Sequence, residues 1–439
     1  MRFLYWFAPG LYIKRWLVLF GIGILAVSIG INLILEGTIL GFLAGEAKKI
    51  FQAVLGNTGG VVGGGVLAVA GGVLILLSIR EMGKAFIRLD FPGCLHNRVK
   101  SVYQRQYLRR GPRIVVIGGG TGLSVLLRGL KEYTSNLTAI VSVTDDGGSS
   151  GRLRGQFGIL PPGDLRNCLL ALADTEPAME NLFNYRFEKG KELAGHSLGN
   201  LLIAAMAELT GSFETAIREV SKVLAIRGRV LPSTLDNIVL AAELQDGSMI
   251  MGESNISGNT KPIKKVFTIP GCCKPFQEAL EAILEADAVI LGPGSLYTSV
   301  MPNLLVPGIV DALRKNRGIK IYVCNIMTQP GETIGYSASD HLRAIYHHAG
   351  PGLVEYVIVN NKEIPAYYKE KYAREGAGVV RVDLEKLGKL NVKVIASPLI
   401  QEEEHIRHNS RALAEIILKL VMKRKGYATR GAANCLFLL

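Results

Sequence analysis

The sequence contains few of the residues that mark several common classes of protein. Its six cysteines form no C-x-x-C pair, which indicates neither a zinc site nor a disulfide framework, and a reducing compartment is expected. Charged residues make up only 20% of the chain and hydrophobic residues 49%, a balance that excludes a disordered protein. At 439 residues the chain is about three times the size of an ordinary domain, so more than one structural unit is expected.

Acidic residues are scarce in the first quarter of the chain. Residues 1–113 contain 14 Lys and Arg against 4 Asp and Glu, whereas the remainder contains 36 against 33. The net charge of +13 is therefore concentrated around the hydrophobic N-terminal segments. A nucleic-acid-binding domain needs a basic face on its folded part. We therefore expect no nucleic-acid partner and attribute the basic excess to membrane orientation.

Two long hydrophobic runs lie in this first quarter. Leu17–Leu35 and Val61–Ile79 contain 19 residues each and no charge. Each can cross a hydrocarbon layer of ~30 Å as a helix. A signal peptide would have a shorter apolar core and no second span, and a buried soluble element is the alternative for the glycine-rich second run. Small residues also let membrane helices pack closely, so we predict a two-helix transmembrane hairpin.

Lys and Arg are abundant before the first run and after the second, and only Lys48 and Lys49 lie between the runs. The positive-inside rule then predicts a multi-pass protein of the cell membrane with both termini and the remaining domain in the cytoplasm. The expected parts are a membrane hairpin at 1–90 with spans at about 17–35 and 61–79, a basic linker at 91–112, an α/β domain at 113–422 and a loose tail at 423–439.

From residue 113 onward, short β-branched runs alternate with stretches of helical periodicity. This alternation is typical of an α/β fold, a sheet with helices on both faces. The expected strands are at 113–117, 137–143, 288–291, 320–324, 354–359 and 392–395. The expected helices are at 122–132, 199–209, 213–224, 275–286 and 410–422.

A glycine-rich turn follows the first expected strand. Gly118–Gly122 reads G-G-G-T-G and leads into a helix, so backbone N–H groups and the helix dipole can surround a phosphate there. Leu123 stands where the third glycine of G-x-G-x-x-G would be, and a plain tight turn is the alternative. The second expected strand ends at Asp145 and Asp146, where a dinucleotide-binding fold places the carboxylate that accepts ribose hydroxyls.

A loop rich in glycine, serine and charge follows, with the sequence D-D-G-G-S-S-G-R-L-R at 145–154. Arg152 and Arg154 can neutralise a bound phosphate, and Asp145 or Asp146 can hold Mg²⁺. A solvated turn with ordinary surface charges is the alternative. The next motif, P-P-G-D-L-R-N, adds three polar side chains at a helix entrance, although its aspartate can also be a simple N-cap. These side chains are Asp164, Arg166 and Asn167.

The string G-H-S-L-G at 195–199 matches the nucleophile elbow of α/β hydrolases, with Ser197 as the nucleophile. That motif requires a strongly apolar strand just before the serine, and residues 188–194 are mostly polar. A hydrolase is therefore not expected. His196, Ser197 and Asn200 instead lie at the entrance of an apolar helix, where they can hydrogen-bond a ligand.

Polar loops also follow two later strands, at Gly292–Ser299 and Asn325–Thr333. Because such loops meet at the carboxyl edge of a parallel sheet, they indicate one ligand crevice. His341, His347 and His348 have no carboxylate at ligand spacing, so surface or helix-end positions are expected rather than a metal site.

These motifs together closely resemble the gluconeogenesis factor family (YvcK type) of the CofD-like superfamily. The resemblance covers roughly residues 113–422 and rests on seven motifs in the same order. They are G-G-G-T-G-L-S-V-L-L-R-G-L-K, T-D-D-G-G-S-S-G-R-L-R, P-P-G-D-L-R-N-C-L, G-H-S-L-G-N-L, G-R-V-L-P-S-T, L-G-P-G-S-L-Y-T-S and N-I-M-T-Q-P-G-E-T. The resemblance implies a Rossmann-like cytoplasmic domain. The two N-terminal spans depart from many relatives and put a freely soluble location in doubt.

The resemblance also implies ligand positions. A C-terminal stretch, I-R-H-N-S, is similar to the family's sugar-nucleotide contact, although a solvated charge is the alternative for its arginine. The implied ligand-binding residues are Gly119, Gly120, Thr121, Gly122, Asp145, Gly147, Ser149, Ser150, Arg152, Arg166, Asn167, His196, Ser197, Asn200, Tyr372 and Arg407. The candidate metal ligands are Asp145, Asp146 and Asp164, with Mg²⁺ as the ion and no organic cofactor expected.

Two functions follow from this resemblance. The first is a membrane-tethered factor that binds a UDP-sugar, such as UDP-N-acetylglucosamine, and acts in carbon metabolism and cell shape. The second is a transferase similar to the superfamily's 2-phospho-L-lactate transferase, which uses Mg²⁺ and a guanine nucleotide donor. The motifs contain no obvious general base or nucleophile, which favours the first. The oligomeric state is undetermined, and a homo-oligomer is allowed.

Overall fold

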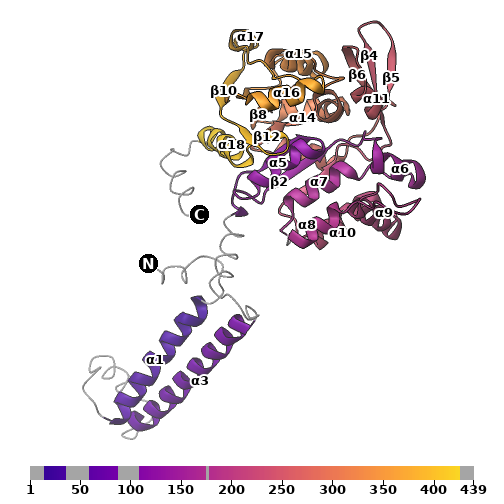
Figure 1. Cartoon of the computed structure of the whole chain (residues 1–439). Helices are drawn as coiled ribbons and strands as arrows, with labels where there is room; N and C mark the ends of the chain where they lie inside the picture. The colour runs from indigo at the N-terminus through magenta and orange to yellow at the C-terminus, as the bar shows by residue number, and fades with distance from the viewer. Residues whose placement is uncertain (1–13, 36–58, 88–107, 175–176, 426–439) are drawn as a thin grey trace. The chain divides into compact units, whose positions relative to one another are not determined.

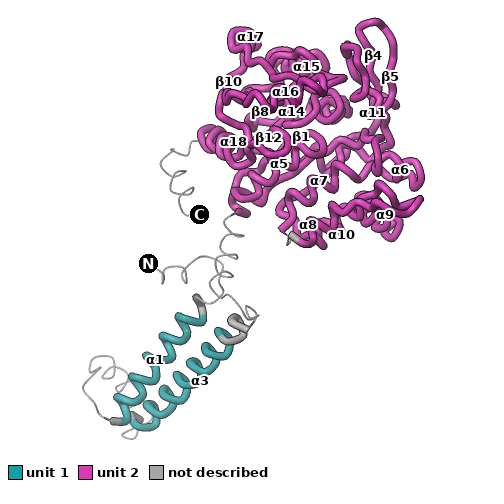
Figure 2. The backbone as a smooth tube through the Cα atoms, in the orientation of Figure 1, with its two compact units in different colours: residues 1–107 teal, residues 108–439 magenta. Residues whose placement is uncertain are grey.

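The computed structural model describes residues 14–35, 59–87, 108–174 and 177–425. The chain divides into two units, residues 1–107 and residues 108–439 (Figure 2). Most of the expected basic linker and loose tail lies outside the described residues.

The first unit contains two long apolar helices, α1 (Lys14–Leu35) and α3 (Gly59–Ile87), shown in indigo and purple in Figure 1. Within them, Trp16–Ile34 and Val61–Met82 are long and apolar enough to cross a membrane. They pack against each other along their length. Two apolar helices in contact are what a membrane hairpin requires, so this part of the sequence prediction is compatible with the structure.

Glycines allow the two helices to approach closely. A Cβ atom at Gly71 would lie 2.7 Å from the carbonyl oxygen of Gly23, and one at Gly30 would lie 2.6 Å from the carbonyl oxygen of Gly64. Side chains at these positions would force the backbones apart. In contrast, a Cβ atom at Gly72 would meet nothing within 4 Å. Only one face of the glycine-rich helix therefore depends on glycine for packing.

The second unit is built on a seven-stranded sheet in which every pairing is parallel. The strand order is β10-β9-β8-β7-β1-β2-β3. The strands are β1 (Ile114–Gly118), β2 (Leu137–Val141), β3 (Arg229–Pro232), β7 (Ala288–Leu291), β8 (Ile319–Val323), β9 (Tyr356–Asn360) and β10 (Lys393–Ser397). Six of them confirm the expected strands. The seventh, β3, was not predicted because it begins with an exposed arginine and ends in proline.

Successive residues of the interior strand β1 face opposite cores. Val115 and Ile117 of β1 belong to one hydrophobic cluster, and Ile114 and Val116 belong to the other. All five residues of this strand are buried. A strand buried on both sides reads as a continuous apolar run, which is how β1 appears in the sequence. The predicted arrangement of helices on both faces is therefore confirmed.

The helices of this unit include all five that the sequence predicts. The C-terminal helix packs on α5 through a buried apolar face that includes Leu413 and Ile417, as its periodicity indicates. The helices are α5 (Gly120–Leu130), α6 (Gly148–Phe157), α7 (Gly163–Leu172), α8 (Pro177–Asn184), α9 (Leu198–Thr210), α10 (Phe213–Val223), α11 (Glu253–Ser257), α12 (Gln277–Glu285), η3 (Leu296–Val300), α13 (Met301–Leu305), α14 (Ile309–Lys315), α15 (Ala338–Ala349), α16 (Ala366–Arg374), α17 (Leu384–Gly388) and α18 (Ser410–Arg424).

Two small antiparallel sheets were not predicted. One contains β4 (Val239–Leu244), β5 (Met249–Met251) and β6 (Ile263–Ile269) in the order β5-β4-β6. Helix α11 connects β5 to β6. The other pairs β11 (Ile400–Glu402) with β12 (Ile406–His408). β5, β11 and β12 have three residues each, which is too short to produce a recognisable alternation of polar and apolar residues. β4 and β6 have six and seven residues, so length does not explain why they were missed.

The close glycine contacts predict the effect of a large side chain in the hairpin. We expect Gly71→Leu to weaken association of α1 and α3 by about 1–3 kcal/mol, because the side chain has no space to occupy. The measurement is energy transfer between dyes on the two helices during an SDS titration of the full chain. Gly72→Leu is the matched control and should leave the midpoint unchanged. Equal midpoints for both variants would contradict the packing.

Candidate functional site

The candidate site lies at the carboxyl edge of the parallel sheet, around the interior strand β1. β1 pairs with β2 on one side and with β7 on the other. From β1 the chain builds the sheet outward through β2 to β3. It then returns to β7, on the other side of β1, and builds outward through β8, β9 and β10, so the strand order changes direction at β1. In open α/β sheets the loops that leave the strands on the two sides of such a point separate and form a crevice.

Four helices begin at or beside this edge and are connected to one another near their first turns. Asp164 of α7 contacts the glycines that begin α5. Ser150 of α6 accepts a hydrogen bond from the backbone N–H of Gly163, the first residue of α7, at 3.1 Å. Ser149 of α6 contacts His196 just before α9. Helix N-termini carry unpaired N–H groups and partial positive charge, so their grouping favours an anionic ligand.

The sequence interpretation of residues 145–154 as a loop was wrong in part. Only the first residues form a turn, in which the Gly147 N–H donates to Asp145 Oδ1 at 2.9 Å. A helix, α6, begins at Gly148, so Ser149, Ser150 and both arginines are helical. Glycine and serine are weak helix formers, so the sequence alone does not favour a helix here. Hydrogen bonds from this segment to the start of α7 and to His196 before α9 stabilise the helix instead.

The glycine turn after β1 is shaped by an internal carboxylate. A Cβ atom at Gly119 would lie 2.6 Å from Asp164 Oδ2, and one at Gly120 would overlap Asp164 Oδ1. Gly120 also has a φ of +38°, which L side chains rarely adopt. On the other side of the turn, a Cβ atom at Gly122 would lie 2.6 Å from the Pro293 carbonyl oxygen. The three glycines are therefore required by close packing, whereas Thr121 is exposed.

Asp164 itself is in an unusual electrostatic position. Burial and, secondarily, the nearby charge of Asp145 raise the pKa of Asp164 to about 7, while the Gly120 N–H and Arg166 act in the opposite direction. It lies in the first turn of α7, whose N-cap is Pro162, so it does not serve as an N-cap. The carboxylate instead faces the N-terminus of α5.

The two neighbouring aspartates have different roles. Asp145 lies near Asp164, since its Oδ2 would be 3.2 Å from a Cβ atom at Gly163. Asp146 turns to α11, where its Oδ1 accepts hydrogen bonds from the N–H and hydroxyl of Ser254 at 2.9 and 2.6 Å. Among the described residues, no group of three or more His, Cys, Asp or Glu is arranged to hold a metal ion. Asp145 and Asp164 are therefore the two of the three predicted metal ligands that lie near each other, whereas Asp146 is engaged by Ser254.

Two further carboxylates adjoin this pair and were missed in the sequence. Burial and the charges of Asp145 and Asp164 raise the pKa of Glu253 to about 9, and its Oε2 has no hydrogen-bond partner. Glu332 accepts hydrogen bonds from the Tyr297 N–H at 3.0 Å and the Thr298 hydroxyl at 2.8 Å, and burial raises its pKa. Glu253 lies outside the seven motifs, and Glu332 lies in the motif N-I-M-T-Q-P-G-E-T but was not singled out as a site residue.

Polar side chains around the start of α9 form a short hydrogen-bonded relay. Asn200 Nδ2 donates to Ser149 Oγ at 3.1 Å, and Ser149 Oγ lies 2.9 Å from His196 Nδ1. A hydroxyl can donate one hydrogen bond and accept two, so Ser149 can pair with either tautomer of the His196 ring. Burial and the charges of Arg152 and Arg186 lower the pKa of His196, in agreement with a neutral ring.

Ser197 is a helix cap rather than a nucleophile. Its hydroxyl accepts a hydrogen bond from the Asn200 N–H, and Arg166 Nη1 donates to the same oxygen. No strand of the main sheet leads into it, so the hydrolase geometry is absent from this segment. The second guanidinium nitrogen of Arg166 donates to Asn167 Oδ1 at 2.8 Å. Arg166, Asn167 and Ser197 are therefore brought together, as the sequence predicts for a ligand site.

Tyr372 and Arg407 lie on α16 and β12, and β12 packs against α5, the helix that follows the glycine turn. The Tyr372 hydroxyl on α16 accepts a hydrogen bond from the Ile406 N–H at 3.1 Å, and Arg407 is exposed on β12. A cavity of about 380 Å³ lies nearby, at the carboxyl ends of β8 and β9, and shares Ile326 and Ile364 with the cluster that contains Tyr372. The described contacts of these two residues do not reach the glycine turn.

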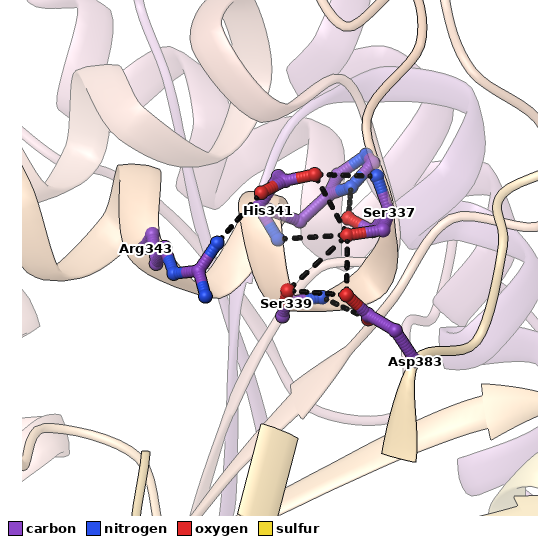
Figure 3. A network of polar contacts seen from close by, with 6 residues as sticks. Ser337, Ser339, His341, Arg343 and Asp383 are labelled. Carbon is purple, nitrogen blue, oxygen red and sulfur yellow. Dashed lines mark hydrogen bonds and ion pairs between the residues drawn. The ribbon is translucent and has the colours of Figure 1, made fainter. Parts of the chain in front are cut away.

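The three histidines of α15 have structural contacts. His341 is fully buried, contrary to expectation, and its Nδ1 pairs with the Ser337 carbonyl oxygen at 2.8 Å. Figure 3 shows the network at the start of this helix, in which Asp383 accepts hydrogen bonds from the hydroxyls of Ser337 and Ser339. His348, at the other end, accepts from the Val266 N–H at 3.0 Å. The network fixes the helix that follows the loop containing Glu332.

The raised pKa of Glu253 predicts a pH-dependent stability. The folded chain holds a proton on this group between pH 4.5 and about 9, so the free energy of unfolding falls as the pH rises through that range. We expect Glu253→Gln to raise the melting temperature at pH 8 by several degrees, on the order of 2 kcal/mol, and to have little effect at pH 5. Calorimetry of the full chain would measure this. Glu363→Gln, at an exposed carboxylate, is the control, and an unchanged melt of Glu253→Gln at pH 8 would refute the assignment.

Comparisons with known proteins agree with this architecture. The family described as 2-phospho-L-lactate transferase CofD matches residues 114–400. A putative gluconeogenesis factor of Clostridium acetobutylicum is 44% identical over 98% of this chain and 94% of its own length. The gluconeogenesis factor of Bacillus subtilis is 49% identical over 71% of this chain and 98% of its own. A crystal structure of a UPF0052 family member from Bacillus halodurans has a TM-score of 0.69 and 52% identity, and covers 70% of this chain and 99% of that one.

These relatives differ in how much of the chain they match. The Clostridium relative aligns with almost the whole chain, whereas the Bacillus relatives have no counterpart for about 30% of it. Both groups share the α/β unit that contains the seven motifs, and the identities are far above what a shared fold alone requires. The chain therefore belongs to the gluconeogenesis factor family of CofD-like proteins.

Proposed function

We propose that the protein is a membrane-tethered factor that binds a UDP-sugar, such as UDP-N-acetylglucosamine, and acts in the regulation of gluconeogenic carbon metabolism and cell shape. The observation that carries the proposal is the grouping of the first turns of α5, α6, α7 and α9 beside the glycine turn. Helix N-termini supply N–H donors and positive dipole ends to a diphosphate. Asp145, after the second strand, can accept ribose hydroxyls. The uracil and the sugar come from the family resemblance.

Mg²⁺ is the proposed ion of the site. Asp145 and Asp164 would hold it together with phosphate oxygens, because two carboxylates alone leave most of its coordination positions to the ligand and water. Burial and, secondarily, the charge of Asp145 raise the pKa of Asp164. A bound cation would offset the repulsion between the two carboxylates.

A transferase is the second candidate. The acidic pair and the family described as 2-phospho-L-lactate transferase CofD support it, since phosphoryl-type transfer needs little beyond positioning and a metal. Against it, the relay at His196 uses Nδ1 internally, and Ser197 is occupied by Arg166. Binding without turnover is therefore the better account of these side chains.

Calorimetric titration of the full chain in detergent with UDP-N-acetylglucosamine and Mg²⁺ tests the binding. We expect Asp145→Ala to weaken binding tenfold or more, because it removes a charged acceptor worth about 1.5–3 kcal/mol. Thr121→Arg should block the glycine turn with bulk. The matched control is Thr215→Arg, which changes an exposed threonine in the first turn of α10.

Three outcomes of this titration would reject parts of the proposal. Tight binding of guanine nucleotides without any UDP-sugar signal would favour the transferase. Wild-type affinity in both site variants would place the ligand elsewhere. Equal affinity for the UDP-sugar in chelator and in Mg²⁺ would reject the proposed role of the metal ion.

The topology is tested separately. Basic residues flank both outer ends of the hairpin, so we expect the N-terminus and the α/β unit on the cytoplasmic side. A reporter peptide fused after Leu439 should be inaccessible to an impermeant label in intact cells and accessible after permeabilisation. Labelling in intact cells would reverse the orientation.

A further inference from the structure

The end of the α/β unit opposite the candidate site carries many basic side chains. At this amino edge of the parallel sheet the strands begin, with β1 at Ile114, β7 at Ala288 and β8 at Ile319. Exposed cations lie in the segments before two of these strands and at the end of α18. They are Arg109, Arg110, Arg113, Lys315, Arg317 and Lys425, which we call the basic edge.

Contacts at Asp287 hold the segments of the basic edge together. The Oδ2 atom of Asp287 accepts a hydrogen bond from the Arg113 N–H at 2.8 Å and lies 2.7 Å from Lys425 Nζ in an ion pair. The carbonyl oxygen of Asp287 accepts a hydrogen bond from the Ile319 N–H at 3.1 Å, two residues after Arg317. Three segments that are far apart in the sequence therefore meet at one place on the surface.

The charge of the basic edge is not neutralised by its neighbours. In the described part of the chain, Glu285 and Asp287 are the carboxylates that form ion pairs with these cations. Arg110 and Arg317 are exposed, and no described residue forms an ion pair or a hydrogen bond with their side chains. Cations at helix C-termini offset the helix dipole, which accounts for Lys315 in the last turn of α14. It does not account for the cations that precede β1, so the edge presents uncompensated positive charge to solvent.

The chain enters the α/β unit at the basic edge. Twenty residues, 88–107, separate the end of α3 from Leu108, the residue before Arg109. A chain of that length spans at most about 70 Å even when it is fully extended. A membrane crossed by α3 would therefore lie within reach of the basic edge, and the tether would raise the effective concentration of the edge at its surface. Cytoplasmic leaflets carry anionic lipids, which attract Lys and Arg close to a membrane-spanning segment.

We propose that the basic edge docks on the anionic headgroups of the membrane to which the chain is tethered. This inference rests on the proposed tether and its orientation, and it does not depend on the ligand of the crevice. The attraction is electrostatic, so it requires anionic lipid and weakens as salt screens it. Because the glycine turn lies at the opposite edge of the sheet, docking in this way leaves the crevice open to the cytoplasm.

The test measures, by mass spectrometry, how fast a neutral acylating reagent modifies single lysines of the full chain in lipid nanodiscs. Lys315 reports on the basic edge. Lys274 is the internal control, because it is exposed beside Pro275, which pairs with Thr234 beyond the carboxyl end of β3. We expect Lys315 to react about threefold more slowly when about 30% of the phosphatidylcholine is replaced by phosphatidylglycerol. About 500 mM salt should abolish this protection, and Lys274 should react equally in both lipids.

Two variants test whether the cations cause the protection. Arg110→Gln and Arg317→Gln change exposed side chains without described partners, so both chains should fold. We expect each to weaken docking about fivefold, which corresponds to about 1 kcal/mol for a cation near an anionic surface. Arg381→Gln is the matched control, because Arg381 is exposed and pairs with Ser337 beyond the carboxyl end of β8. It should behave as wild type, and melting temperatures verify that all variants are folded.

Several results would overturn the inference. Equal modification rates of Lys315 in the two lipids, or full protection in both arginine variants, would show that the basic edge does not dock on anionic lipid. The proposed binding of a UDP-sugar would stand in either case, because the experiment contains no nucleotide. Protection of Lys315 by an added duplex oligonucleotide, but not by anionic lipid, would assign the edge to nucleic acid instead. A chain that does not enter nanodiscs would reject the tether itself together with the inference.

Discussion

The contact between the Asp164 carboxylate and the glycine turn is the constraint on which the rest of the site depends. It excludes side chains at two successive positions and fixes the entry into α5. It also places a negative charge, disfavoured by burial, against a helix N-terminus that favours anions. The Asp164 carboxylate therefore stabilises the glycine turn and would compete with a phosphate group bound at the N-terminus of α5. A ligand phosphate must bring a proton or a cation with it, or displace the carboxylate.

Charge in the crevice is separated into two regions. Asp145, Asp164, Glu253 and Glu332 influence one another on one side, and burial raises the pKa of three of them. Arg152, Arg166 and Arg186 lie on the other side, around the residues before α9. Asp164 and Arg166 act on each other's pKa, so the two regions are electrostatically coupled. Retaining both signs of charge suits a ligand that carries phosphate together with a metal ion.

The sequence predicted those parts of the molecule whose signal is local. Buried parallel strands read as short apolar runs, and glycine turns and helix entrances read as motifs, so β1, α5 and the polar residues of α9 were expected. β3 was not, because it begins with an exposed arginine and ends in proline, and β5 was not, because it has only three residues. Glu253 and Arg186 were missed for a different reason. Each becomes notable only when folding places it beside charges from elsewhere in the chain.

The bond between Asp146 and Ser254 joins two parts of the unit that are otherwise separate in sequence. Asp146 follows Asp145 directly, so a rotation of the backbone at one residue is transmitted to the other through a single peptide plane. Ser254 belongs to α11, which is attached to the small antiparallel sheet. The segment that carries Asp145 is thus attached to an outlying small sheet of the unit. A ligand that displaced Asp145, as the proposed function allows, would also displace this sheet, and a partner bound to the sheet could respond to that change of shape.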